Sequence, residues 1–326
     1  FEGTSLPDVF VTPPGTLQNG DAVDGAGARD TLRLVEDDDP QSRAITEGAW
    51  SALTSVEEIA ASAHAGGIDL RFDERVNTTG LSQIDLSGDT DAGGANSVDL
   101  SDTLIRSDAI NRFVGSAGDD TLYLATASQY QTLVPRFGSE QAKLDGGPGT
   151  DTLSFARGPS SGSKSLDLTR ALNFEKFVGN GASDEVTVDG GSFTSVETGQ
   201  GDDSLRVEAL TIGENGLEPA DGDGTFDLQA DLGAGSDDRL VLQLRDLQET
   251  AFQNLDPSAL TTDVEALTFD LGWTNAPDTV VFDDSHVPAA VSAIRLAGRG
   301  EQPGTIDFSG LSRGDGGLNV RTEDLR

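Results

Sequence analysis

A short phrase that places an aspartate directly before an alternating apolar stretch recurs along the chain. Clear examples are Asp30-Thr-Leu-Arg-Leu34, Asp120-Thr-Leu-Tyr-Leu124 and Asp203-Ser-Leu-Arg-Val207. The apolar period of two, with Val, Thr and Phe enriched, predicts a short β-strand with one buried face. Each occurrence therefore brings one carboxylate to the start of a predicted strand.

Glycine-rich turns precede most of these aspartates and indicate cation chemistry. Alternating glycines let the backbone turn sharply and bring its carbonyl oxygens toward one point, where the aspartate adds a carboxylate. Backbone and carboxylate oxygens are the hard ligands that Ca²⁺ prefers. The turns are of a shorter kind, at 115–120, 146–151 and 198–203, and of a longer kind, at 25–30, 179–184 and 233–238.

We therefore predict that the turn residues ligate calcium. The candidate carboxylates are first Asp120, Asp151 and Asp203, then Asp30, Asp184 and Asp238, with Asp119 and Asp202 as second carboxylates and Gly115, Gly146 and Gly199 as carbonyl donors. The alternative is ordinary turn chemistry, in which Gly-Asp is common. Six turns that lead into the same strand phrase favour calcium, with the affinity of extracellular modules, ~10⁻⁴ to 10⁻³ M.

A second phrase, an apolar residue followed by Glu and a further apolar residue, precedes the glycine turns. It occurs at Val56-Glu-Glu-Ile59, Phe174-Glu-Lys-Phe177 and Val264-Glu-Ala-Leu267, so the repeating unit is strand, glycine turn, strand. Asp102 and Asp120 lie 18 residues apart, the length of one coil of two strands and two turns. Longer gaps correspond to two coils or to one coil with an insertion.

Stacked coils of this length predict an all-β fold, a parallel β-roll or β-helix-like solenoid with short helical or loop insertions. The aspartates of successive coils then form a column along one edge, where unshielded carboxylates would repel each other. A divalent cation between coils removes that repulsion, because the turn carbonyls share it.

The glycine turns resemble the nonapeptide Gly-Gly-x-Gly-x-Asp-x-apolar of RTX, or haemolysin-type, calcium-binding repeats. The best match is Asp145-Gly-Gly-Pro-Gly-Thr-Asp-Thr-Leu153, and 115–122 and 198–205 are close. The nonapeptides stand alone instead of in tandem, which resembles the degenerate repeats of bacterial surface-layer proteins and RTX adhesins. That resemblance implies type I secretion, calcium-dependent folding outside the cell, and self-assembly or adhesion at the surface.

Composition and charge exclude several classes of protein. Asp and Glu number 57 against 21 Lys and Arg, a net charge of −36 that repels phosphate backbones and argues against nucleic-acid binding. The absence of Cys and the presence of only two His exclude a thiolate or multi-histidine metal site. No apolar run approaches ~18 residues, so no membrane insertion is expected. Halophilic solvation is the alternative explanation of the charge, and it can coexist with calcium.

Several segments depart from the repeat. A weak boundary near residue 105 separates a β-rich region, 1–104, from a degenerate solenoid, 105–326, although one continuous solenoid is the alternative. Residues 46–53 are expected to form a short helix with Trp50 inward. Helical excursions or surface loops are expected at 127–137 and 245–255, and a flexible insertion at 156–165.

The chain shows no recognisable active site, so we expect a protein that is not an enzyme. Residues 158–162 match Gly-x-Ser-x-Gly but lack the strand and helix that a nucleophile elbow needs. His64 and His286 are expected at the surface. Trp50, Trp273, Tyr123 and Tyr130, which could stack on sugars, are more often core or interface residues.

The expected function is that of an extracellular, calcium-stabilised structural protein at the bacterial cell surface. Its partners would be other copies of itself, in a surface layer, filament or adhesin, and cell-surface polysaccharide is a further candidate. Two alternatives from other classes remain open, namely the calcium-binding secretion tail of a larger RTX enzyme and a carbohydrate-binding module.

Overall fold

In a computed structural model, the described residues run from Phe1 to Thr322 with internal gaps. The residues left out are 19, 36–43, 64–66, 135–142, 161–163, 190–192, 214–215, 220–227, 248–256, 258–263, 274–278, 285, 288, 301–304, 312–317 and 323–326. Strands account for 44% of the residues and helices for 10%, so the fold is all-β. The strands form parallel sheets of many members, which confirms the predicted fold class.

The chain forms two compact units, and each is described separately. Unit 1 comprises residues 1–160 and 170–180, and unit 2 comprises residues 161–169 and 181–326. The chain therefore enters unit 2 at residue 161, returns to unit 1 for residues 170–180, and enters unit 2 again at residue 181. This division differs from the one near residue 105 that the repeat spacing suggested.

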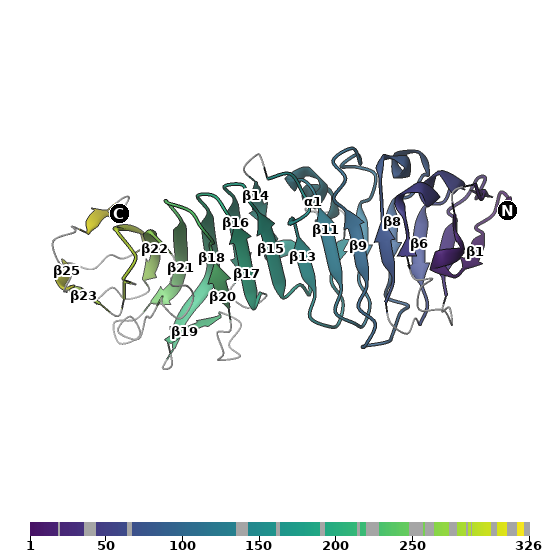
Figure 1. Ribbon diagram of the computed structural model, residues 1–326. Helices are drawn as coiled ribbons and strands as arrows, with labels where there is room; N and C mark the ends of the chain where they lie inside the picture. The colour runs from purple at the N-terminus through teal and green to yellow at the C-terminus, as the bar shows by residue number, and fades with distance from the viewer. Residues whose placement is uncertain are drawn as a thin grey trace. The chain divides into compact units, whose positions relative to one another are not determined.

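Unit 1 is built from coils that contribute strands to two runs of parallel pairs (Figure 1). The first run has the order β1 (Val9–Thr12), β3 (Thr31–Leu34), β6 (Glu58–Ala61), β8 (Gln83–Asp85), β10 (Arg112–Val114) and β12 (Lys143–Asp145). The second has the order β4 (Ala44–Ile45), β7 (Asp69–Arg71), β9 (Ser97–Leu100), β11 (Thr121–Leu124), β13 (Thr152–Ser154) and β15 (Lys176–Asn180). A small parallel pair joins β2 (Val23–Asp24) to β5 (Leu53–Thr54).

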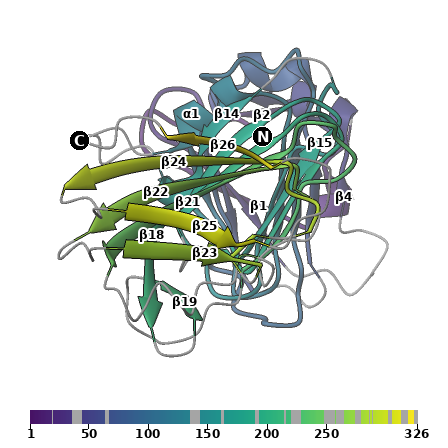
Figure 2. The same ribbon diagram turned by 90° about the vertical axis from the view of Figure 1, so that its left-hand side faces the viewer.

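Unit 2 repeats the same construction on a longer sheet, whose strands lie side by side in Figure 2. Its order is β14 (Ser165–Asp167), β16 (Glu185–Asp189), β18 (Ser204–Gly213), β21 (Arg239–Leu247), β22 (Ala266–Trp273), β24 (Ala293–Gly300) and β26 (Asn319–Thr322). The further strands are β17 (Ser195–Gly199) paired with β20 (Gln229–Asp231), β23 (Thr279–Asp283) paired with β25 (Thr305–Gly310), and β19 (Gly216–Pro219), which is antiparallel to β18.

The parallel register stacks apolar side chains into continuous buried rows. Leu32, Ile59, Ile84, Phe113 and Leu144 occupy matching positions on neighbouring strands of unit 1, and all are fully buried. The equivalent row of unit 2 consists of Leu166, Val186, Leu205, Leu240, Leu267 and Ile294. The strands of these rows therefore contribute one or more buried apolar side chains each to a core that runs across the coils of its unit.

The helical segments are short and confirm two of the predictions. The 3₁₀ helix η2 (Glu47–Ala52) buries Trp50, which stacks on Phe72 at 4.0 Å, and helix α1 (Ala127–Leu133) buries Tyr130. The prediction of a helix at 245–255 is wrong for residues 245–247, because they continue β21. Residues 248–255 lie outside the described residues. The remaining 3₁₀ helices are η1 (Pro14–Thr16), η3 (Glu74–Thr78) and η4 (Leu168–Arg170).

None of the helices within the described ranges combines the length and the hydrophobicity that a membrane crossing requires.

Candidate functional site

The six predicted aspartates that end the glycine turns occupy one structural position, the residue directly before a strand. Neighbouring strands place these residues in columns that run across the coils. Column 1 contains Asp8, Asp30 and Glu57; column 2 contains Asn96, Asp120, Asp151 and Glu175; column 3 contains Lys164, Asp184, Asp203, Asp238 and Glu265.

Within a column, each carboxylate accepts a hydrogen bond from the backbone of the preceding coil. The amide of Asp120 donates to Oδ1 of Asp151 at 2.7 Å, and the amide of Asp151 donates to Oε2 of Glu175 at 2.7 Å. Column 3 repeats the pattern, because the amide of Asp203 donates to Oδ1 of Asp238 at 2.7 Å and the amide of Asp238 donates to Oε2 of Glu265 at 2.9 Å. A side-chain ladder thus continues the sheet hydrogen bonding at each strand start.

The backbone carbonyls of the same residues complete the link to the next coil. Thr152 donates its amide to the carbonyl of Asp120 at 2.8 Å, and Arg239 donates its amide to the carbonyl of Asp203 at 2.7 Å. Each column residue therefore holds two coils together through both its amide and its carbonyl. This arrangement explains why the aspartate directly precedes the strand.

In several column aspartates, one carboxylate oxygen is buried without a hydrogen-bond donor. Asp30, Asp151, Asp184 and Asp203 have exposed fractions of 0–2%. Their Oδ2 atoms are buried, and no hydrogen-bond donor among the described residues reaches them. A buried carboxylate oxygen without a partner is costly, so it calls for a proton or a cation.

The pKa values reflect the same cost. Desolvation by burial raises the pKa of Asp151 to about 8, and its neighbours Asp120, Glu175 and Asp119 add repulsion that acts in the same direction. Burial also raises the pKa values of Asp120, Asp184, Asp203 and Asp238, against the lowering effect of the amides and, at Asp184, of Lys164. The columns therefore favour neutralised carboxylates.

A glycine is needed for close approach in several of the turns. A Cβ on Gly25 would lie under 3.0 Å from both the carbonyl oxygen of Ser55, on the next coil, and Oδ2 of Asp30. At Gly146 the equivalent pair is the carbonyl of Asn173 and Oδ2 of Asp151. The turn therefore brings a carboxylate oxygen and a carbonyl of the neighbouring coil to the same side of the glycine, a position that only glycine leaves open.

The predicted second carboxylates have a different role from the column residues. Asp119 and Asp202 are exposed. Asp119 accepts the amide of Thr150 at 2.8 Å, and Asp202 accepts the amide of Ser236 at 2.9 Å, which lowers the pKa of Asp202. These carboxylates also link neighbouring coils, but from the solvent side.

The predicted carbonyl donors are placed differently from one another. The carbonyl oxygen of Gly146 and Oδ2 of Asp120 both lie under 3.0 Å from the Cβ position of Gly115. The carbonyl of Gly199 accepts the amide of Ala234 at 3.3 Å and lies against the Cβ position of Gly233. Gly115 itself is the close-approach residue, and its amide donates to the carbonyl of Asp145 at 2.8 Å.

Sequence reasoning missed the residues that begin and end the columns. Glu57, Glu175 and Glu265 belong to the apolar-Glu-x-apolar phrase, and each ends a run of aspartates. Asn96 takes the place of an aspartate in column 2, where its amide donates to Oδ1 of Asp120 at 2.9 Å. Lys164 begins column 3 with its Nζ 3.7 Å from Oδ1 of Asp184. Their common signal is the position one residue before an alternating apolar stretch.

Spacing along the chain misled the interpretation in two places. Asp102 begins no strand, because its segment forms a turn in which Asp102 accepts the amide of Leu104 at 2.9 Å. Asp120 and Asp151, although 31 residues apart, lie on adjacent coils. The longer gaps at these positions therefore correspond to one coil with an insertion, not to two coils.

The remaining candidates are His286, His64, Tyr123 and Trp273. His286 was expected at the surface but is buried, with Nδ1 2.8 Å from Oδ1 of Asp283 and its ring against Phe282. His64 lies outside the described residues. The guanidinium of Arg157 lies over Tyr123, with its Cζ 3.7 Å from the ring centre, and the side chain of Trp273 lies outside the described part of the chain.

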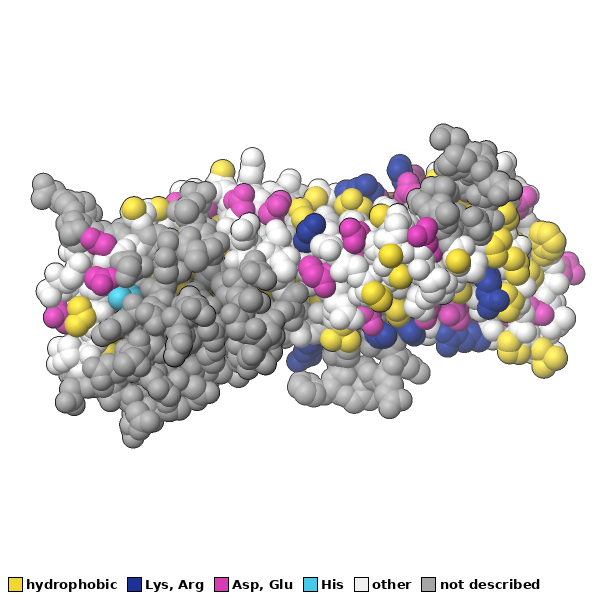
Figure 3. Space-filling view, turned by 90° about the horizontal axis from the view of Figure 1, so that it is seen from below, with side chains coloured by type: hydrophobic (Ala, Val, Ile, Leu, Met, Phe, Trp, Pro, Cys, Tyr) yellow, Lys and Arg dark blue, Asp and Glu magenta, His cyan; other side chains and the backbone are white. Residues whose placement is uncertain are grey.

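Surface charges are mixed on the described face in Figure 3. Ion pairs on the outward positions of unit 1 include Arg112 with Asp85 at 3.0 Å and Lys143 with Asp145 at 2.7 Å. The ion pairs among the described residues involve only some of the acidic side chains, so negative charge remains there for solvent or ions to screen.

The donor chemistry of the columns fits a hard cation such as calcium, because each offers carboxylate and backbone carbonyl oxygens. No group of three or more acidic or histidine side chains gathers around one point in the part of the chain that the structure describes. Backbone carbonyls would therefore have to supply most of the ligands. The four unpartnered Oδ2 atoms mark where the charge of a cation is needed.

Comparisons of the chain with protein-family models, with curated proteins and with solved structures yield no match. The functional interpretation therefore depends on the geometry of the columns and of the sheet edges.

Proposed function

We propose that the chain is a non-enzymatic structural protein that assembles with copies of itself at the bacterial cell surface, outside the cell, and that calcium stabilises its coils. The single observation that carries the proposal is the set of buried column aspartates with an unpartnered oxygen, namely Asp30, Asp151, Asp184 and Asp203. Their charge has to be neutralised before the coils can stack.

Calcium is the neutralising ion that best suits this chemistry outside a cell. Oδ2 of Asp30, Asp151, Asp184 and Asp203 would bind it together with turn carbonyls such as those of Ser55 and Asn173. Bound calcium would supply positive charge and a crosslink between coils, which a chain without cysteine otherwise lacks. The amides of the preceding coil hold Oδ1 of the same residues and orient them.

Parallel coils also suit a structural role. Most of the described strands pair in parallel with a strand of a neighbouring coil, so the architecture extends by repetition. The described columns contain carboxylates in one repeated role, as hydrogen-bond acceptors between coils. A structural function needs no further chemistry from them.

The direct test is a calcium titration of the full chain after treatment with EGTA, followed by circular dichroism and thermal melting, with magnesium as the matched control. We expect calcium to raise the melting temperature, whereas magnesium has a much smaller effect because it demands octahedral coordination. Isothermal titration calorimetry then gives the number of ions bound.

Electron microscopy with and without calcium tests the assembly. Ordered assemblies that form only with calcium support the proposal. An unchanged melting temperature in EGTA contradicts the role of calcium, and a monomer at high protein concentration under both conditions contradicts the structural role.

A further inference from the structure

Column 3 contains a buried lysine at a position that aspartates occupy on the following coils. Lys164 directly precedes β14, and only 6% of the residue is exposed. Its backbone amide donates to Oδ1 of Asp184 at 3.0 Å, and its carbonyl accepts the amide of Glu185 at 2.7 Å. Lys164 therefore has the same place in the ladder as the column aspartates, with the opposite charge.

The ammonium group of Lys164 lies beside the carboxylate of the next coil. Its Nζ is 3.7 Å from Oδ1 of Asp184, and the exposed fractions of the two side chains are 5% and 0%. A buried ammonium group is costly unless an opposite charge compensates it, and the same holds for a buried carboxylate. In this pair each group compensates the charge of the other.

The charges around the aspartates with an unpartnered Oδ2 differ in sign. Desolvation raises the pKa values of Asp151, Asp184 and Asp203. Acidic neighbours raise those of Asp151 and Asp203 further, whereas Lys164 lowers that of Asp184. The chain itself therefore supplies a positive charge at Asp184, while Asp151 and Asp203 stand among negative ones.

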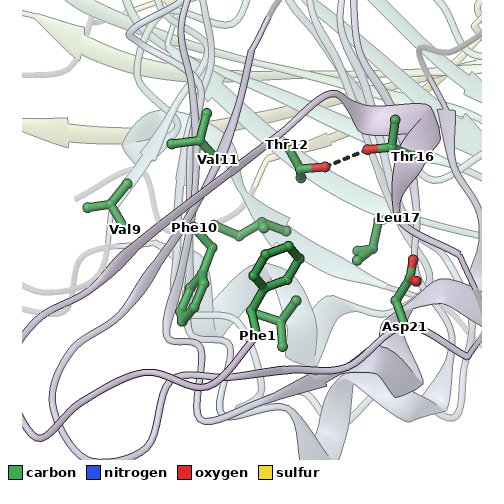
Figure 4. A pocket seen from close by; sticks show the side chains of 10 residues that line it. Phe1, Val9, Phe10, Val11, Thr12, Thr16, Leu17 and Asp21 are labelled. Carbon is green, nitrogen blue, oxygen red and sulfur yellow. Dashed lines mark hydrogen bonds between the residues drawn. The ribbon is translucent and has the colours of Figure 1, made fainter.

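The first described members of the other columns bring no such charge. Column 2 begins with Asn96, whose side chain is neutral. Column 1 begins with Asp8, and the cavity of about 550 Å³ beside the following strand is lined by apolar side chains such as Phe10, by two threonines and by Asp21 (Figure 4). Among the described column residues, Lys164 is therefore the one that carries a positive charge.

We propose that the ammonium group of Lys164 takes the place of a calcium ion at Asp184. This inference rests on the proposed calcium binding and states which of the four aspartates with an unpartnered oxygen depends on the ion least. The coils of β14 and β16 then stack without calcium, whereas the coils at Asp30, Asp151 and Asp203 need it. Because the ammonium group repels a second cation, Asp184 has the lowest calcium affinity of the four.

The first test compares two chemically identical substitutions in the full chain, by urea denaturation in EGTA. Asp184→Asn leaves the ammonium group of Lys164 buried without a carboxylate, so we expect the folding equilibrium constant to fall at least tenfold. Asp151→Asn is the matched control, and it should raise that constant, because acidic groups surround the carboxylate that it removes. The two substitutions are therefore expected to act in opposite directions.

A double-mutant cycle tests whether the two groups act on each other. In EGTA, Lys164→Met should lower the folding equilibrium constant at least tenfold, and Lys176→Met, at an exposed lysine, less than threefold. Lys164→Met combined with Asp184→Asn removes both charges, so this double variant should be more stable than either single variant. The comparison also holds if a single variant fails to fold, because the double variant should still fold.

Isothermal titration calorimetry on the same variants then counts the calcium ions bound. Relative to the wild type, Asp151→Asn should bind one ion fewer, Asp184→Asn the same number, and Lys164→Met one more. Stabilisation by Asp184→Asn in EGTA, loss of an ion from that variant, or a double variant no more stable than both single ones overturns the inference and leaves the proposed function standing. A wild type that binds no calcium overturns the proposed role of calcium, and the opposite effects in EGTA then decide by themselves whether Lys164 compensates Asp184.

Discussion

At the scale of single residues, the column aspartates show why an aspartate directly precedes so many of the strands. A carboxylate at the strand start accepts an amide of the preceding coil, and an aspartate has the reach to do so while its own backbone pairs with the next coil. The cost is a second oxygen buried without a donor at Asp30, Asp151, Asp184 and Asp203. The fold therefore requires that the charge on this oxygen be neutralised.

Replacing one of these aspartates by asparagine separates its two roles. Asp151→Asn keeps an Oδ1 acceptor for the amide of Asp120 and removes the buried charge, and Asn96 already shows that column 2 accommodates asparagine. In EGTA we expect Asp151→Asn to raise the free energy of unfolding by about 1–3 kcal/mol at neutral pH. In calcium the same variant should gain less stability from the ion than the wild type does.

Chemical denaturation with and without calcium measures both effects. Asp202→Asn is the control at an exposed carboxylate; because hydrogen bonds from Ser236 lower the pKa of Asp202, we expect this variant to be no more stable than the wild type. An Asp151→Asn variant that is less stable than the wild type in EGTA would show that the buried charge is not the dominant cost.

The pKa of Asp151 predicts how stability depends on pH without calcium. Its folded value, about 8, lies above the ~3.9 of an unfolded aspartate, so folding favours the protonated form. The contribution of this proton is fully present below about pH 4 and is lost as pH rises toward 8. We expect the stability difference between the wild type and Asp151→Asn to widen over this range, measured by urea denaturation in EGTA, and a difference that is constant with pH would contradict the assignment.

At the scale of elements, the glycine turn and the strand form one unit. Gly25 lets the carbonyl of Ser55 and the carboxylate of Asp30 approach from the same side, whereas Gly27 in the same turn has open space around it. In this turn only Gly25 is therefore required by packing, whereas both glycines of the turn at 115–120 approach a carbonyl of another segment closely. The strands that follow are short, and their stability comes from the rows of buried side chains and from the ladder.

Two substitutions within one turn test this distinction. Gly25→Ala forces the Ser55 carbonyl or Asp30 away, and we expect a loss of about 2–4 kcal/mol in the free energy of unfolding. Gly27→Ala should stay within about 0.5 kcal/mol of the wild type, since nothing lies near its Cβ position. Thermal and urea denaturation of both variants provide the comparison, and equal losses would contradict the close-approach role of Gly25.

At the scale of the whole molecule, two mechanisms could offset the repulsion that a net charge of −36 produces: screening by salt and binding of calcium. Salt screens exposed charges over roughly 10 Å at 0.1 M but reaches buried column oxygens much less. Calcium bound between coils acts on the buried charge directly. The two mechanisms therefore differ in the ion concentration at which they stabilise the fold.

The free energy of unfolding measured in calcium and in sodium chloride distinguishes the two mechanisms. At a calcium concentration ten times the dissociation constant, each site should add about 1.4 kcal/mol to the free energy of unfolding. Sodium chloride at the same ionic strength should add much less. Equal effects of the two salts, or stabilisation only at molar sodium chloride, would favour halophilic solvation of the surface instead.

The sequence alone determined the all-β class, the parallel strands, and the residue position from which each aspartate acts. It could do so because the apolar period of two and the glycine turns are local signals, visible within about ten residues. The short helices at 47–52 and 127–133 were predictable for the same reason.

Only the tertiary structure decided which coils are neighbours. Insertions change the coil length from 19 residues, between Asp184 and Asp203, to 35, between Asp203 and Asp238, so spacing along the chain does not reveal register. Register in turn places Glu175 and Asn96 in the same column as Asp151 and buries His286. These features depend on hydrogen bonds and packing between segments that are distant in the chain, and a local pattern carries no information about them.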